Sequence, residues 1–297
     1  MRQHRFIQEM TSFKQYLEKK YAPSTVKAYF RDIEKYHCEK GKEAAEKGTY
    51  NDVMAYIEKL RGQKKNPHSI NRELCAIKAW YTWLVVSGQR KGHPCRYIEL
   101  KDLKTSPLQL QDLFTVPELE LLMERKERFY SLAERNQVVI SLLIYQALTA
   151  PEISLLTLND IDLKEGTIKV KPSRKLNGRT LPLKTKQVML FYRYIHQIRP
   201  AFLNGESERL VITDRGTPEN GEGIAYLVET LRPLFPTRKL TVHTIRASVI
   251  ANRLKTGEDL RKVQLFAGHK KISSTERYRQ SASEELKAAI QKYHPLK

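Results

Sequence analysis

The stretch 243–278 reads HTIRASVIANRLKTGEDLRKVQLFAGHKKISSTERY and places four chemically reactive side chains in a fixed order. His243 and Arg246 are three residues apart, so a helix would place both on one face. His269 follows a glycine, and Tyr278 comes nine residues later. A tyrosine hydroxyl can attack a phosphodiester and form a covalent link, and a guanidinium group suits the charge on phosphate oxygens. The segment therefore groups residue types that are suited to chemistry at a phosphate.

The charge of the chain indicates which molecule carries that phosphate. Among 297 residues, 53 lysines and arginines outnumber 33 aspartates and glutamates, a net charge of +20. A division at residue 110 leaves +10 on each side, so the excess is spread along the chain rather than confined to one tail. A polyanion that touches both parts, above all nucleic acid, fits this distribution. A basic protein without such a partner is the simpler alternative.

Other classes of protein fit the composition less well. No run of residues approaches 18 apolar positions, so we expect no membrane span. Residues 1–10 (MRQHRFIQEM) lack the apolar core of a signal peptide. Cys38, Cys75 and Cys95 are scattered without metal-ligand spacing, which predicts reduced thiols, a cytoplasmic location and no metal site.

Residues 1–104 show helical patterning with almost no strand signal, so we expect a helical domain there, and its share of the positive charge suits DNA binding. One helix begins after Pro23, and its apolar face consists of Val26, Tyr29, Ile33 and Tyr36. A second helix covers 70–83, and its apolar stripe consists of Leu74, Ile77, Trp80, Tyr81 and Leu84. This spacing favours a core role for the aromatic residues over base stacking. Residues 105–113 are polar and without a period, which predicts a linker.

Residues 114–297 show a mixed pattern, typical of a second domain that is mainly α with a small antiparallel β-sheet. A capping box at Thr115, with a proline in the first turn, predicts a helix at the domain edge. Further helices are expected over 136–145 (NQVVISLLIY) and 188–198. The apolar run 210–212 (LVI) predicts a short strand.

A small hairpin is predicted between these helices. Alternation over 167–170 (TIKV) indicates one strand, and 179–183 (RTLPL) indicates its return. Asn177 and Gly178 form the dipeptide that most strongly favours a tight hairpin turn. The connection between the strands would therefore place Lys175 at the turn of the sheet.

These segments together resemble the tyrosine recombinase, or phage integrase, family. His243 and Arg246 are similar to its HxxR box, and residues 265–272 (LFAGHKKI) are similar to its LGHxxI segment. Residues 273–278 (SSTERY) are close to its TTxxY, and residues 142–153 (LLIYQALTAPEI) resemble LLYxTGLRxSEL. The resemblance covers nearly the whole chain, including the helices of the family's N-terminal core-binding domain. HxxR alone is a weak signal, whereas its combination with the later GH and tyrosine is specific.

The resemblance implies a site-specific DNA recombinase with a core-binding domain, a linker and a mixed α/β catalytic domain. Such an enzyme cuts and rejoins DNA strands through a covalent 3′-phosphotyrosine intermediate, here on Tyr278. His243, Arg246 and His269 would stabilise the phosphate. Because the energy of the cut bond stays in the protein–DNA link, no cofactor is expected.

Basic residues outside this set are expected to lie on the DNA. A lysine on the hairpin would protonate the leaving 5′ oxygen as general acid. Ungapped alignment of that position favours Arg174, while Lys175 is adjacent and keeps the chemistry. Further DNA contacts are expected from Arg174, Arg179, Lys27, Arg72 and Lys78.

One position departs from the family pattern. Counting back from the shared Glu152, the family's first catalytic arginine falls on Thr149. Loss of one phosphate-clamping donor removes roughly 2–4 kcal/mol of transition-state stabilisation, about 10²–10³ in rate. Three interpretations are open: a slower enzyme in which Arg174 or Arg179 reaches the phosphate, a recombinase with altered chemistry, or a DNA-binding relative that no longer cuts. We favour an active recombinase because the other signature residues persist.

The family's assembly implies a homo-tetramer on two paired sites of double-stranded DNA, at the nucleoid. Integration of a mobile element, excision and chromosome resolution all fit. The terminal segment 283–293 has a short apolar stripe suited to docking on a neighbouring protomer. A related topoisomerase is the nearer alternative, disfavoured by the compact N-terminal domain, and a sequence-specific DNA-binding protein without catalysis is the alternative of a different class. Each site residue also has an ordinary structural alternative: Tyr278 is one of 15 tyrosines, and Lys175 is equally suited to a solvated turn.

Overall fold

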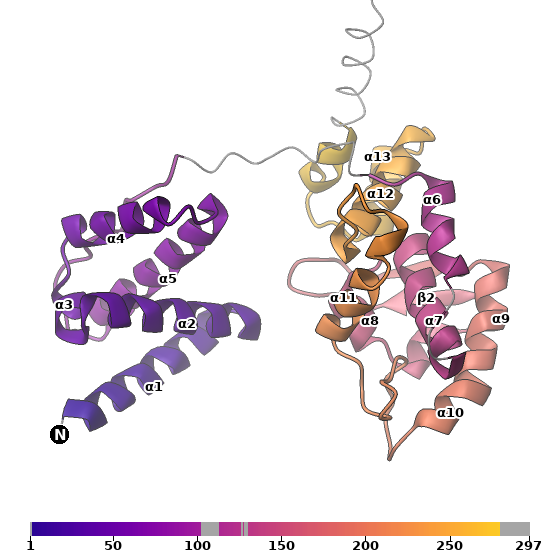
Figure 1. Ribbon diagram of the computed structural model, residues 1–297, viewed down its shortest axis with the longest axis horizontal. Coiled ribbons are helices and arrows are strands. Elements are labelled where there is room, and N and C mark those ends of the chain that lie inside the picture. The colour runs from indigo at the N-terminus through magenta and orange to yellow at the C-terminus, as the bar shows by residue number, and fades with distance from the viewer. Residues whose placement is uncertain (1, 102–112, 126, 128–129, 280–297) are drawn as a thin grey trace, which may run out of the picture. The chain divides into compact units, whose positions relative to one another are not determined.

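The chain divides into two compact units, residues 1–105 and 106–297, and each is described by itself (Figure 1). The computed structural model describes residues 2–101, 113–125, 127 and 130–279. All of the expected linker 105–113 except its last residue lies outside these ranges, as does the terminal segment 283–293. No helix of the described part is long and apolar enough to cross a membrane.

The described part of the N-terminal unit is helical, as expected. Its helices are α1 (Arg2–Lys20), α2 (Pro23–Lys40), α3 (Lys42–Lys47), α4 (Tyr50–Gly62) and α5 (Pro67–Val86). Helix α5 begins where the Asn66 side chain accepts the His68 N–H at 2.9 Å, with proline in the first turn. Its predicted apolar stripe is buried, and Phe13 packs edge-on against Trp80 with ring centroids 4.9 Å apart. The aromatic residues of α5 are therefore core, not a base-stacking surface.

The C-terminal unit is mainly helical with one small sheet, which confirms the predicted fold class. Its helices are α6 (Val116–Leu121), α7 (Ala133–Tyr145), α8 (Ala150–Leu155), α9 (Thr185–Arg193), α10 (Arg199–Phe202), α11 (Gly221–Glu229), α12 (Val242–Lys255) and α13 (Leu260–Ala267). A π-helical segment, Tyr194–Ile198, continues α9. The strands β1 (Ile161–Asp162), β2 (Thr167–Val170) and β3 (Arg179–Pro182) form an antiparallel sheet in the order β1-β2-β3.

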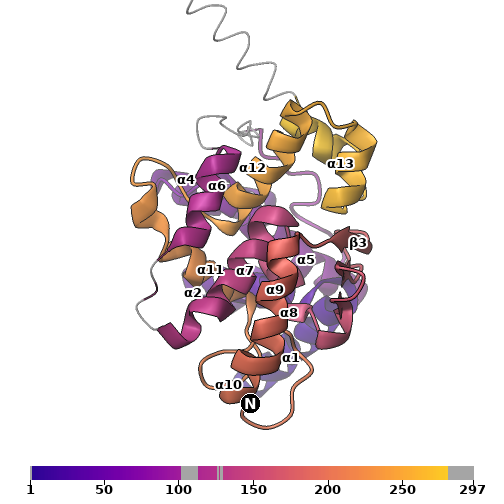
Figure 2. The same ribbon diagram turned by 90° about the vertical axis from the view of Figure 1, so that its right-hand side faces the viewer.

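Helix α7 is the centre of this unit, and it packs against α12, α9 and α11 (Figure 1). Its residues Val138, Leu142 and Leu143 have no exposed surface. Helix α12 is also tied to the start of the unit, because Phe114 N–H donates to Ser248 Oγ at 2.8 Å. The core therefore holds α12 against α7, while β3 packs against α13 (Figure 2).

The prediction of a tight turn at Asn177-Gly178 is wrong. The chain instead turns earlier, where Ser173 N–H donates to Leu176 O at 2.8 Å. Asn177 N–H donates to Gly268 O at 2.8 Å, and Leu176 forms an isolated bridge with His269. A partner distant in the sequence thus takes the backbone groups that a two-residue turn would have used.

The predicted strand over 210–212 is also wrong. This buried segment makes only the isolated bridge between Ile212 and Pro218, with Thr157 and Arg209 bridged just before it. Its backbone groups are divided among several partners, including Leu156 O, which accepts the Leu210 N–H at 2.9 Å. The run is apolar because it is core, and no neighbouring strand pairs with it among the described residues.

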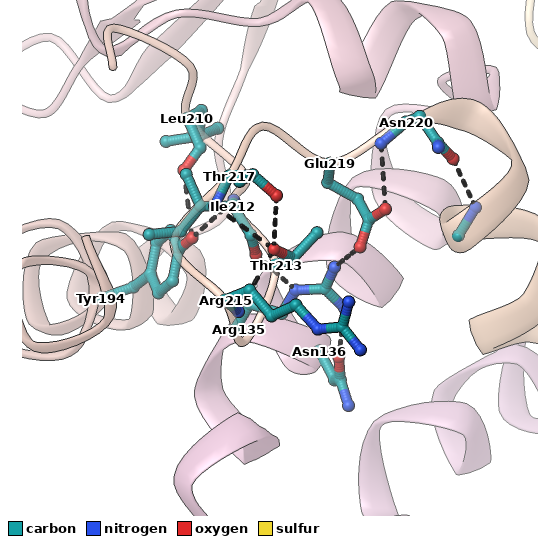
Figure 3. A network of polar contacts seen from close by, with 11 residues as sticks. Arg135, Asn136, Tyr194, Leu210, Ile212, Thr213, Arg215, Thr217, Glu219 and Asn220 are labelled. Atoms are coloured by element: carbon teal, nitrogen blue, oxygen red, sulfur yellow. Dashed lines mark hydrogen bonds and ion pairs between the residues drawn. The ribbon is translucent and has the colours of Figure 1, made fainter. Parts of the chain in front are cut away.

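A polar network closes this irregular segment onto α7 (Figure 3). The Arg135 guanidinium donates to Ile212 O at 3.1 Å and to Asn136 Oδ1 at 2.7 Å, and it forms an ion pair with Glu219. The side chains of Arg135 and Glu219 are only 9% and 10% exposed. From the other side, Tyr194 Oη donates to Leu210 O at 3.0 Å. Together these contacts give hydrogen-bond partners to the backbone of a buried loop that forms no regular strand pairing among the described residues.

We predict that Glu219→Ala lowers the free energy of unfolding by about 3–5 kcal/mol, because it leaves the Arg135 charge buried without its partner. Urea denaturation followed by circular dichroism measures this. The matched control is Glu229→Ala, which removes an exposed pair with Arg232 and should cost about 0.5 kcal/mol or less. Equal losses for the two variants would contradict a structural role for the network.

Candidate active site

Helix α12 positions the first two predicted site residues. At its start, Thr241 Oγ1 accepts the Thr244 N–H at 3.0 Å, and Thr241 N–H donates to Thr244 Oγ1 at 2.8 Å. His243 lies in the first turn and is exposed, whereas Arg246 is only 6% exposed. The structure therefore separates the pair into a surface histidine and a buried arginine.

Arg246 joins three segments of the unit. Its guanidinium donates to Ala147 O, between α7 and α8, and at 2.6 Å to Ala267 O, at the end of α13. Burial lowers the pKa of this guanidinium, and the Glu152 carboxylate, 3.9 Å from Nη1, opposes that effect. Arg246 is thus fixed by backbone carbonyls with its charge near one carboxylate.

The Gly268-His269 turn ends α13 and requires glycine for two reasons. Gly268 has a φ of 71°, in the left-handed region. A Cβ at this position would also lie 2.5 Å from Arg179 Nη1. The turn is then secured by Gln264, whose carbonyl accepts the His269 N–H at 3.1 Å and whose Nε2 donates to His269 O at 3.0 Å.

His269 is buried and held in one orientation. Its Nδ1 lies 2.8 Å from Thr275 Oγ1, and the residue is 8% exposed. Burial, followed by the positive charges of Arg246 and Arg179, lowers the pKa of His269 to about 4. Near pH 7 the ring is therefore neutral, able to give one hydrogen bond rather than a charge.

Tyr278 lies beside this histidine, on the helical segment 273–279. The Tyr278 and His269 rings are stacked, with centroids 6.2 Å apart and an interplanar angle of 9°. Burial raises the pKa of the Tyr278 phenol, and the charges of Arg246 and Arg277 act in the opposite direction. The hydroxyl is thus neutral near pH 7, in a position where neighbouring cations favour its ionisation.

The β2–β3 connection, residues 171–178, is attached to the Gly268-His269 turn. Arg174 and Lys175 are exposed at its tip, where Ser173 Oγ accepts the Lys175 N–H at 3.3 Å. The bridge from Leu176 to His269 secures the connection next to the catalytic candidates. The loop thus carries two basic side chains on a backbone that is fixed to the site.

Thr149 has a defined structural role at the position that departs from the family pattern. It caps α8: its Oγ1 accepts the Glu152 N–H at 3.4 Å, and its own N–H and hydroxyl both donate to Glu152 Oε2 at 2.9 Å. Glu152 is 7% exposed. The threonine therefore fixes one oxygen of a buried carboxylate.

Arg179, expected on the DNA, lies at the other oxygen of that carboxylate. Its Nη1 is 2.7 Å from Glu152 Oε1, and its side chain is 6% exposed. Sequence reasoning did not foresee this burial, nor did it place Glu152 in the site. The available signal was the Thr-x-x-Glu capping pattern at 149–152, which matches the box recognised at Thr115.

The three basic residues expected on DNA in the N-terminal unit differ in their surroundings. Lys27 is exposed. Arg72 donates to the buried Asp32 from Nε at 2.7 Å and from Nη2 at 3.1 Å. Lys78 Nζ donates to Ile98 O at 2.6 Å. Arg72 and Lys78 therefore have structural partners within their own unit.

Two family models match most of the chain, one in each unit. The model described as the phage integrase family matches residues 113–285, and the phage integrase N-terminal SAM-like domain matches residues 10–88. The chain belongs to the phage integrase family. The stacked Tyr278 and His269, with Arg246 beside them, lie within the first of these matches.

Individual integrase-family proteins are similar over nearly the whole length. The tyrosine recombinase XerC of Oceanobacillus iheyensis is 28% identical over 296 residues, which cover 96% of this chain and 95% of that protein. The tyrosine recombinase XerD of Listeria innocua is 26% identical over 297 residues, covering 94% and 95%. A crystal structure of the XerH site-specific recombinase bound to a palindromic difH substrate, a post-cleavage complex, has a TM-score of 0.70 at 16% identity and covers 89% of this chain and 78% of that one. That structural likeness concerns the fold alone.

We predict that His269 makes the protein less stable in mild acid. Its pKa is 6.5 in an ordinary setting and about 4 here, so the folded state binds fewer protons between these values. The stability that neutral His269 contributes is fully present above pH 6.5 and is lost as the pH falls toward 4. The free energy of unfolding should drop by roughly 2 kcal/mol between pH 7 and pH 5 for this reason.

The measurement is urea denaturation at these two pH values for wild type and His269→Asn, whose amide can keep the contact to Thr275. The variant should lose less stability on acidification, by roughly the amount calculated for the histidine. An identical loss in both proteins would show that His269 is not the group that titrates.

Proposed function

We propose that this protein is a site-specific DNA recombinase that cuts and rejoins DNA through Tyr278. The observation that carries this proposal is the stacking of the Tyr278 ring on His269, with Arg246 buried beside them. A buried tyrosine among phosphate-binding groups suits nucleophilic attack on a phosphodiester. Family membership and the basic charge of both parts of the chain support DNA as the substrate.

In this reaction the Tyr278 oxygen attacks the phosphorus, and the bond to the 5′ oxygen breaks. The phenolic proton passes to water as the new phosphotyrosine bond forms, and Lys175 donates a proton to the departing 5′ oxygen. Arg246 and His269, with His243 at the edge of the site, donate hydrogen bonds to the non-bridging oxygens, where negative charge grows. Attack by a 5′ hydroxyl of another strand reverses the sequence and releases the tyrosine.

A second candidate function is sequence-specific DNA binding without cleavage. Thr149 favours it, because the family pattern has an arginine there that would stabilise the transition state. Both candidates share the DNA partner, the fold and the basic surface residues Lys27, Arg174 and Lys175. They differ only in whether a covalent protein–DNA link forms.

The assembly and the setting follow from the recombinase proposal. Exchange between two DNA sites requires one nucleophile for each of four strands, so we infer a homo-tetramer on paired sites. The substrate is chromosomal or mobile-element DNA, which places the protein at the nucleoid in the cytoplasm. Integration, excision and resolution use the same chemistry and differ in the sites that are paired.

We predict that a nicked duplex carrying the cognate site traps a protein–DNA adduct that survives denaturation. Tyr278→Phe should abolish the adduct and leave the affinity for DNA nearly unchanged, because only the nucleophilic oxygen is removed. Denaturing electrophoresis of labelled DNA gives the adduct, and filter binding gives the affinity.

The matched control is Tyr226→Phe, since Tyr226 is 68% exposed on α11. It should form the adduct at the wild-type rate. An adduct that persists in Tyr278→Phe would assign the nucleophile to another tyrosine, with Tyr293, outside the described residues, the next to test.

We predict a steep salt dependence of DNA binding. Both parts of the chain carry +10, so phosphate contacts should be numerous and the affinity should fall by about 10³-fold or more between roughly 50 and 200 mM salt. Lys27→Ala should lower the slope of log K against log salt by about one. Titration with fluorescent duplex DNA measures both, and an affinity independent of salt would contradict a DNA partner.

A further inference from the structure

Arg179 has hydrogen-bonding capacity that the protein itself does not use. Its Nη1 donates to Glu152 Oε1 at 2.7 Å and approaches Asn177 O at 3.4 Å. Its Nε and Nη2 are buried and have no hydrogen-bond partner among the described residues. Buried arginine N–H groups without a partner are costly, so their presence at a candidate site points to a ligand.

The charge around Arg179 specifies the kind of ligand. Arg179 and Arg246 bring two positive charges to a single carboxylate, Glu152, and His269 is neutral near pH 7. One positive charge is therefore left over in a buried place. A phosphodiester carries one negative charge, and its paired oxygens suit the forked donors of a guanidinium group.

The position of Arg179 relates it to the residue that departs from the family pattern. Thr149 holds Glu152 Oε2, while Arg179 holds Glu152 Oε1. The two side chains thus lie on opposite oxygens of the same carboxylate, on elements that are distant in the sequence. Arg179 also lies against Gly268, the residue next to His269, where a Cβ would be 2.5 Å from its Nη1. The Arg179 guanidinium therefore lies between Glu152, which Thr149 also contacts, and Gly268, which precedes His269.

We propose that Arg179, from β3, supplies the guanidinium for the scissile phosphate that the family pattern places at position 149. The inference rests on the recombinase function proposed above. Arg179 binds a non-bridging oxygen through Nε and Nη2, while Nη1 stays on Glu152. Thr149 is compatible with this arrangement because its short side chain caps α8 and leaves Glu152 Oε1 to Arg179. Arg174 is exposed at the loop tip and is not needed for this role.

The competing interpretation is that Arg179 only neutralises Glu152 and secures the hairpin. Three variants separate the two: Arg179→Ala, Arg179→Lys and the double variant Thr149→Arg/Arg179→Ala. The rate of adduct formation on a nicked duplex is measured in a single turnover, beside the affinity for intact DNA and the thermal stability. Arg232→Ala removes an exposed arginine that pairs with Glu229 and serves as the matched control.

Arg179→Ala should slow adduct formation by about 10²–10³-fold with affinity changed by about three-fold or less, as expected for loss of one transition-state donor. The rate of adduct formation for Arg179→Lys should lie between those of wild type and Arg179→Ala, since an ammonium group keeps the charge without the forked donors. The double variant should recover about ten-fold or more over Arg179→Ala, because an arginine at 149 reaches the same phosphate. Thr149→Arg alone should change the rate little.

A substrate of altered charge provides a readout that a structural role would not move. With a neutral methylphosphonate at the scissile position, a donor that acts on the negative oxygen matters less, so the defect of Arg179→Ala should shrink by about ten-fold or more. A defect equal on both substrates, or no recovery in a folded double variant, would overturn the proposal. If Arg179→Ala does not fold, Arg179→Lys carries the same comparison between substrates.

The failure of this inference is distinguishable from failure of the proposed function. A wild-type adduct through Tyr278 that Arg179→Ala leaves unchanged defeats the role of Arg179 alone. A wild type that forms no adduct on a demonstrated cognate site defeats both, and adduct formation by Thr149→Arg would then favour the DNA-binding candidate.

Discussion

The candidate site depends on the buried carboxylate of Glu152. Burial alone would raise its pKa, but the hydrogen bond from Arg179, with nearby positive charge and the Thr149 backbone N–H, brings the pKa below its ordinary value. The carboxylate therefore stays ionised although only 7% of the residue is exposed. It caps α8, holds Arg179 and lies 3.9 Å from Arg246, so one charge orients groups from three elements. Without it, two like charges would be buried side by side.

Backbone contacts also attach the β2–β3 connection to the segment that holds Gly268 and His269. Asn177 N–H donates to Gly268 O, and Leu176 bridges His269, so the loop that carries Lys175 is attached to the Gly268-His269 turn. Glycine at 268 suits this attachment, because its φ of 71° is left-handed and a Cβ there would lie 3.0 Å from the backbone oxygen of Asn177. Under the proposed function, substrate groups bound at the turn and at the loop tip would be held in one frame, as in-line phosphoryl transfer requires.

The sequence predicts the helices, and it names Arg246, His269 and Tyr278, which the structure brings together, because both leave local patterns. The apolar face of α5 and the capping box at Thr115 follow from residues spaced three and four positions apart. The burial of Arg179 and the failed Asn177-Gly178 turn depend instead on partners far along the chain, which local rules do not include. At Thr149 the family pattern indicates only the loss of an arginine, whereas the capping pattern with Glu152 is present in the sequence itself.

Under the proposed function, the arrangement would let a site that lacks the family's first arginine keep Tyr278 as its nucleophile. Burial holds both Tyr278 and His269 neutral, so the cations nearby must favour ionisation of the phenol as the phosphate approaches. A phosphate brings negative charge that opposes this ionisation, and each guanidinium counteracts it. Loss of one guanidinium would thus weaken the site at the nucleophile as well as at the transition state. Under the proposed role of Arg179, a second guanidinium held by the same glutamate, but supplied from β3, would keep the net charge of the site while residue 149 serves as a helix cap.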